Sequence, residues 1–226
     1  MILDFRGPAW FFGTDIAIQV LGLVISLIIA YYGYKLYKIT SKKLDLYFSI
    51  AFFLLGLEFI IYILVIPAVF IYYNYFPTLQ PGILLTIARS LNFIYMFAIS
   101  LAYIFLILVY SGIEKKNVIA LISSLILALT LYSYITRSYF GFNLTSTLLT
   151  GFIVFHAYRN YLAKKTKNAF LVLLTFVLLT FSHFILAYAF YTNIQLAFLP
   201  GHISQFLGFA SLLIMLIRVK YGRKKK

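Results

Sequence analysis

Apolar residues form seven long runs along the chain, separated by short segments that carry most of the charges. The runs lie near residues 13–34, 44–73, 82–110, 118–134, 143–162, 169–191 and 199–219. A bilayer core about 30 Å thick is crossed by roughly 20 apolar residues of α-helix. Five of the runs are close to this length. The second and third are longer than needed, which favours helices that tilt or protrude from the bilayer. The pattern predicts an all-α integral membrane bundle of seven transmembrane helices, with residues 1–226 forming a single domain.

The basic residues between the runs predict how the helices are oriented. Most of the 19 Lys and Arg residues follow the first, third, fifth and seventh runs, whereas Arg6 and Arg137 lie on the opposite side. Basic connections stay on the cytoplasmic side of a membrane. We therefore expect a multi-pass protein of the cell membrane, with its N-terminus outside and its C-terminus in the cytoplasm. The segment before the first run lacks the basic stretch of a cleavable signal peptide, so that run should be retained.

The composition agrees with a membrane protein and excludes several functional classes. Hydrophobic residues make up 64% of the chain and charged residues only 11%, whereas soluble domains carry about 25% charged residues. The absence of cysteine excludes disulfides, thiolate nucleophiles and iron–sulfur ligation. We interpret the formal net charge of +14 as cytoplasmic basic loops that contact anionic membrane lipids. No nucleic-acid partner is expected.

Small residues at four-residue spacing predict where helices pack closely. Gly22, Ser26 and Ala30 recur at this spacing in the first run, as do Ser204 and Gly208 in the seventh. Small side chains let two helix backbones approach in lipid, so these faces should point into the bundle. The fourth run is apolar on nearly all sides, which indicates a helix at the edge of the bundle.

The order of the runs allows an internal repeat. Runs one to three and five to seven have the same predicted orientation, with the fourth as an inverting linker, an arrangement found in some small transporters. The segment 54–60, which contains Glu58, loosely resembles the segment 179–185, which contains His183. Any seven-helix chain shows this alternation of direction, so the repeat is a hypothesis.

The candidate functional residues are the few polar side chains within the apolar runs. An ionisable group in hydrocarbon costs at least about 2.5–3.5 kcal/mol, so each one that occurs needs an explanation. The candidates for ligand binding or proton coupling are Glu58, Arg89, Asn92, His183, His202 and Gln205.

We expect these residues to meet in a polar cavity in the outer half of the bundle. A small polar ligand would enter from outside, with Arg89 as the fixed charge and the amides and imidazoles setting its orientation. Glu58, surrounded by hydrocarbon, should be neutral unless Arg89 approaches it, and could then carry a proton. The alternative is a structural network in which the same groups only bond to one another and fix helix register. Asn143, which begins an Asn-Leu-Thr sequon, falls on the same outer side.

Several functional classes remain open. Enzyme activity is not expected, because the chain has five acidic residues, no metalloprotease or serine-hydrolase motif and no metal-binding cluster. The main hypothesis is a transporter-like bundle that binds a small molecule and needs no cofactor. The alternatives are a receptor-like or accessory subunit that binds a membrane-protein partner, and a haem-binding electron carrier with His183 and His202 as axial ligands.

Two architectural resemblances bear on these classes. Seven helices with an external N-terminus resemble microbial rhodopsins, but Leu212–Leu216 occupies the place where that family has its retinal-binding lysine, so a retinal protein is excluded. Tyr158–Tyr161, Ser182-His183 and the stretch from Gly201 to Gln205 resemble patterns in small, uncharacterised seven-helix membrane proteins of archaea. That resemblance covers the last third of the chain and implies no particular activity.

Overall fold

The structure, a computed structural model, describes residues 12–75, 82–113 and 115–222. In this part of the chain seven α-helices are long and apolar enough to cross a membrane. They are α1 Phe12–Thr40, α2 Lys43–Tyr75, α3 Gly82–Ser111, α4 Lys116–Ile135, α5 Tyr139–Lys164, α6 Lys167–Thr192 and α7 Phe198–Gly222, and a short 3₁₀ helix, η2 Gln195–Ala197, precedes α7. The all-α fold with seven membrane-length helices is therefore confirmed.

The helices extend beyond the predicted apolar runs because helix ends depend on capping as well as on hydropathy. The helix α5 begins at Tyr139, where the Ser138 hydroxyl accepts a hydrogen bond from the Gly141 amide at 3.0 Å. Thr166 caps α6 in the same way, accepting from the Ala169 amide at 3.2 Å. These side chains satisfy amides that have no partner within the helix. A hydropathy pattern does not contain this signal.

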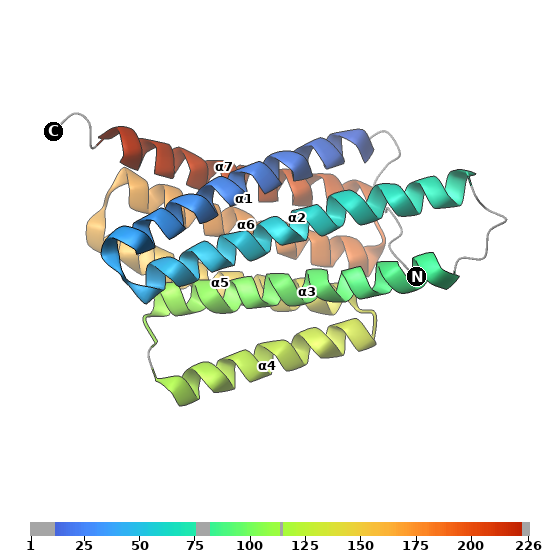
Figure 1. Ribbon diagram of the computed structural model, residues 1–226, viewed down its shortest axis with the longest axis horizontal. Helices are drawn as coiled ribbons and strands as arrows, with labels where there is room; N and C mark the ends of the chain where they lie inside the picture. Colours follow the sequence, from blue (N-terminus) through green and yellow to red (C-terminus); the bar gives the residue numbers. More distant parts are fainter. Residues whose placement is uncertain (1–11, 76–81, 114, 223–226) are drawn as a thin grey trace.

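Six of the helices form a closed ring, and the seventh lies outside it. Around the ring, α1 packs against α2, α2 against α3, α3 against α5, α5 against α6, α6 against α7, and α7 against α1. The helix α4 contacts α3 and α5 and lies apart from the other helices at the edge of the bundle (Figure 1). Only 17% of its span is buried, in agreement with its nearly uniform apolar surface.

The packing within the first three helices matches the packing within the last three. The pairs α1–α2 and α2–α3 correspond to α5–α6 and α6–α7, and the two remaining contacts of the ring, α3–α5 and α7–α1, join one half to the other. We call α1–α3 the first half and α5–α7 the second half. This contact pattern is compatible with a parallel three-helix repeat, which stays a hypothesis.

The small-residue faces lie inside the bundle, as predicted. Gly22, Ser26 and Ala30 are all buried, and a Cβ on Gly22 would lie 2.8 Å from the Phe59 ring. On α7, Ser204 donates a hydrogen bond to the Leu178 carbonyl of α6 at 2.8 Å. Close backbone approach and hydroxyl–carbonyl bonds hold helices together where no hydrophobic effect is available.

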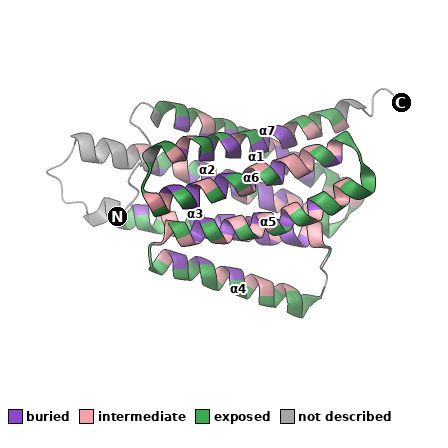
Figure 2. Cartoon of the chain, turned by 180° about the vertical axis from the view of Figure 1, so that it is seen from behind, coloured by how far each residue is buried: buried purple, intermediate pink, exposed green. Residues whose placement is uncertain are grey.

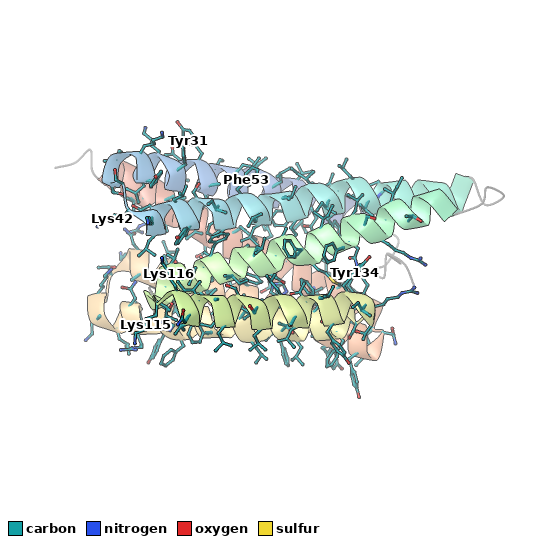
Figure 3. The ribbon with its side chains drawn as sticks, turned by 60° about the horizontal axis from the view of Figure 1, so that its bottom comes forward. Tyr31, Lys42, Phe53, Lys115, Lys116 and Tyr134 are labelled. Carbon is teal, nitrogen blue, oxygen red and sulfur yellow. The ribbon has the colours of Figure 1, made fainter. Side chains whose placement is uncertain are left out.

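Charge separates the two ends of the bundle. Lys42, Lys115 and Lys116 lie at one end, whereas Tyr134 lies toward the other (Figure 3). We call the first the basic end, and we call the opposite end, where α1 begins, the amino end. Buried residues are concentrated along the faces that the ring helices turn toward one another (Figure 2). That the basic end faces the cytoplasm stays a prediction from its charge.

Candidate functional site

The first polar contact joins Glu58 of α2 to Gln205 of α7. The Gln205 side-chain amide donates a hydrogen bond to Glu58 Oε1 at 3.2 Å. Both side chains are buried, with 5% and 7% of their surface exposed. The same two helices also meet through aromatic core residues, since Phe59 of α2 packs edge-to-face on Phe209 of α7 with ring centroids 5.2 Å apart. A carboxyl group is thus held in an apolar interior by one amide.

A second group of polar side chains lies about one helical turn closer to the amino end. Its members are Asp15 and Gln19 of α1, Tyr62 of α2 and His202 of α7, and we call it the amino-end cluster. The Tyr62 hydroxyl donates to Asp15 Oδ2 at 2.6 Å. The Gln19 Nε2 lies 3.4 Å from Asp15 Oδ1 and 3.0 Å from His202 Nδ1. His202 Nδ1 is itself 3.8 Å from Asp15 Oδ1, so one amide bridges an acid and an imidazole.

A third group lies between α3, α5 and α6. His183 of α6 is hydrogen-bonded through Nε2 to the Tyr103 hydroxyl of α3. Its other ring nitrogen, Nδ1, lies 3.1 Å from Asn143 Oδ1 of α5. The Asn143 amide in turn donates to the Tyr139 carbonyl at 2.9 Å. Both ring nitrogens of this buried histidine are therefore occupied.

The three groups together hold the acidic and histidine side chains of the interior. Glu58 belongs to the first group, Asp15 and His202 belong to the amino-end cluster, and His183 belongs to the third group. The interior thus holds two acids and two histidines. Every Lys and Arg side chain whose exposure the structure describes is exposed, so no basic residue other than histidine faces these acids among the described residues.

Four of the six predicted site residues take part in these contacts, and two do not. The four buried and hydrogen-bonded residues are Glu58, His183, His202 and Gln205. They do not form one cluster, because Glu58 bonds to Gln205, His202 belongs to the amino-end cluster and His183 belongs to the third group. Arg89 is exposed and Asn92 is half-buried.

The exposure of Arg89 follows from where it lies in α3. It is within the first turns of that helix, and this end of α3, together with the end of α2, extends beyond the neighbouring helices (Figure 1). A long cationic side chain at a protruding end reaches a polar environment instead of the interior. Among the described residues Arg89 does not approach Glu58, and the acids bond to amides and a hydroxyl.

The structure adds five residues that sequence reasoning did not place in the site, namely Asp15, Gln19, Tyr62, Tyr103 and Asn143. Asp15 lies in the first turn of α1 and Asn143 begins the sequon, and both are buried, with 1% and 5% exposed. Tyr62 and Tyr103 resemble the many other tyrosines of the chain. One usable signal was spacing, because Asp15 and Gln19, like Glu58 and Tyr62, are four residues apart and so share a helix face.

The arrangement can bind polar groups and exchange protons. It offers carboxyl, amide, phenol and imidazole groups in an apolar interior. In the part of the chain that the structure describes, no group of three His, Asp or Glu residues is placed to hold a metal ion.

Comparison of the chain with protein-family models, with curated proteins and with solved structures finds no match.

Proposed function

We propose that this protein is a small-molecule-binding, transporter-like membrane bundle whose binding and coupling centre is formed by the buried polar groups. Glu58 and Gln205 lie at its centre, and the predicted outer side, the amino end, is its route of entry. The observation that carries the proposal is that one polar contact from each group joins the two halves of the ring. These contacts are Glu58–Gln205 from α2 to α7, Gln19–His202 from α1 to α7, and Tyr103–His183 from α3 to α6.

Bonds between the halves are suited to a protein that changes shape around a ligand. Repeat-built transporters move one half against the other around a site near the membrane centre. Such a movement in this bundle must break the three bonds between its halves. A polar ligand that bonds to the same carboxyl, amide and imidazole groups would compensate for their loss, because an unpaired buried polar group costs about 1–3 kcal/mol.

The depth of the central groups supports the same proposal. Glu58 follows the first residue of α2 by 15 positions, and His183 follows the first residue of α6 by 16. At about 1.5 Å per residue, both lie about 23 Å from the helix ends at the basic end. An ionisable residue of each half therefore lies at nearly the same level.

Ser182 adds unused hydrogen-bonding capacity beside His183. Its side chain is fully buried, and its hydroxyl has no hydrogen-bond partner among the described residues. An unsatisfied hydroxyl at this depth is unfavourable. A bound polar molecule would supply the missing partner.

The test begins with the ligand that the protein retains. We would purify the wild-type protein gently in detergent, identify bound molecules by native mass spectrometry, and measure their uptake into proteoliposomes. Glu58→Gln keeps the size and one hydrogen bond of the side chain but cannot lose or gain a proton, so it should abolish uptake. Asp45→Asn is the matched acid-to-amide control, because Asp45 bonds to Thr40 at the basic end.

The competing functions give different results in the same preparation. A fixed protein partner that copurifies, with no bound small molecule and no uptake, would replace the proposal by an accessory or receptor-like role. A haem absorption band would indicate an electron carrier. Haem ligation by His183 would require breaking its bond to Tyr103 or its bond to Asn143, so the geometry favours the transporter-like function.

A further inference from the structure

The amino-end cluster joins an acid, an amide and an imidazole in a way that depends on one proton. Gln19 Nε2 lies within hydrogen-bond distance of His202 Nδ1 and near Asp15 Oδ1. An amide nitrogen can only donate, so His202 Nδ1 acts as the acceptor, and the imidazole is neutral with its proton on Nε2. In this state Asp15 is a carboxylate that accepts from the Tyr62 hydroxyl and from Gln19, and the cluster has a charge of −1.

Addition of one proton changes the bonding without requiring a cavity. A proton on His202 Nδ1 turns this atom from an acceptor into a donor, which can no longer accept from Gln19. Asp15 Oδ1 is already 3.8 Å away, and an approach of about 1 Å would make it a charge-assisted bond. Gln19 Nε2 can still donate to Asp15 in this state. The cluster becomes an ion pair with no net charge.

The surroundings favour uptake of a proton over pairing with a fixed cation. The groups that α1, α2, α3 and α7 place on or next to the cluster are Asp15, Gln19, Glu58, Tyr62, Tyr95, His202 and Gln205. None of them is a lysine or an arginine. A buried carboxylate without a cation is costly, and among the described residues next to the cluster the adjacent histidine is the one group that can supply a positive charge.

We infer that Asp15 and His202, bridged by Gln19, form a proton-binding site at the amino end of the bundle, separate from the Glu58–Gln205 pair. This inference goes beyond the proposed function, since the site can bind a proton whether or not the bundle carries a solute. It adds a second exchangeable proton to the interior, one helical turn closer to the amino end than Glu58. The site joins α1 to α7, so its protonation changes a contact between the two halves.

The test follows the ring nitrogens of the three histidines by NMR in protein labelled with isotopic histidine. His156→Gln and His183→Gln assign the signals. As the pH falls from about 8 to about 5, the range in which histidine ordinarily changes charge, His202 should change from one protonated ring nitrogen to two. In Asp15→Asn this change should be lost over the same range, whereas Asp45→Asn should behave as wild type.

Two further results decide the matter if Asp15→Asn does not fold. His202 that stays neutral throughout the titration of the wild-type protein would overturn the inference without any variant. Tyr62→Phe removes one bond to the Asp15 carboxylate and leaves the acid in place, so His202 should still change to two protonated nitrogens. A normal His202 titration together with uptake that does not depend on Glu58 would refute the proposed function and leave this site intact.

Discussion

The contact between α6 and α7 gives a prediction whose size can be worked out from the structure. Gly208 of α7 lies against α6, and a Cβ added to it would be 3.1 Å from the Thr175 carbonyl oxygen and 3.3 Å from Leu179 Cγ. Both distances are shorter than ordinary van der Waals contact. The oxygen belongs to the backbone of a helix, so relief of the first contact requires α6 and α7 to move apart.

Two effects of opposite sign determine the stability of Gly208→Ala. Replacing a helical glycine by alanine stabilises a helix by about 1 kcal/mol. Overpacking at a tight contact costs typically about 1–3 kcal/mol, so the net change should lie between about zero and 2 kcal/mol of destabilisation. Gly151→Ala in α5 is the matched control, because a Cβ there meets nothing within 4 Å and only the helical gain remains.

The assay compares the two variants by unfolding in mixed micelles, followed by circular dichroism. The helical contribution is common to both, so the difference in free energy of unfolding measures the contact, and Gly208→Ala should be about 1–3 kcal/mol less stable than Gly151→Ala. Equal stabilisation of both variants would refute the close packing of α7 on α6. It would also undermine the positions of His183 and Gln205, which these two helices carry.

Three further predictions follow from the polar contacts and the charges. Tyr103→Phe removes the hydroxyl that bonds to His183 and should lower the free energy of unfolding by about 0.6 kcal/mol, and by no more than about 1.7 kcal/mol, the range measured for such bonds in membranes. A larger loss in the micelle assay would mean that the hydroxyl supports more than this one bond. Arg89→Gln should change stability by less than about 0.5 kcal/mol, because the side chain is exposed, and a large effect would indicate a buried partner. Asn143 should carry no sugar when the chain is made in glycosylating cells, because its side chain is buried. An added glycan in the intact-mass spectrum would contradict the position of the Asn143 side chain against His183 of α6.

The features of the fold that the sequence predicted are those that depend on local composition. The apolar runs locate all seven helices because each must be long enough to cross the bilayer. The uniform apolarity of the fourth run indicated an edge helix, and the spacing of Gly22, Ser26 and Ala30 indicated a buried face. In each case the relevant residues are neighbours on one helix, so the pattern is visible in a single segment.

The site was only partly predictable because it depends on how the helices are rotated and how far they protrude. Arg89 and Tyr103 lie about four helical turns apart on one face of α3, yet Tyr103 is buried and Arg89 is exposed. The difference arises from the protruding end of α3 (Figure 1), which hydropathy does not reveal. Asp15 was overlooked because an acid in the first turn of a helix is usually explained by the helix dipole and the nearby headgroups.

Closure of the ring by α1 and α7 has a consequence for how the protein is made. The ribosome delivers α1 and α2 to the membrane first, while the α7 partners of Asp15 and Glu58, His202 and Gln205, are still to be synthesised. Until then Asp15 has only its partners on α1 and α2, Gln19 and Tyr62, whereas Glu58 lies in or near lipid without Gln205, at a cost of about 2.5–3.5 kcal/mol. The nascent chain is therefore less stable until α7 inserts, and chains truncated before α7 should be preferred substrates for membrane proteases.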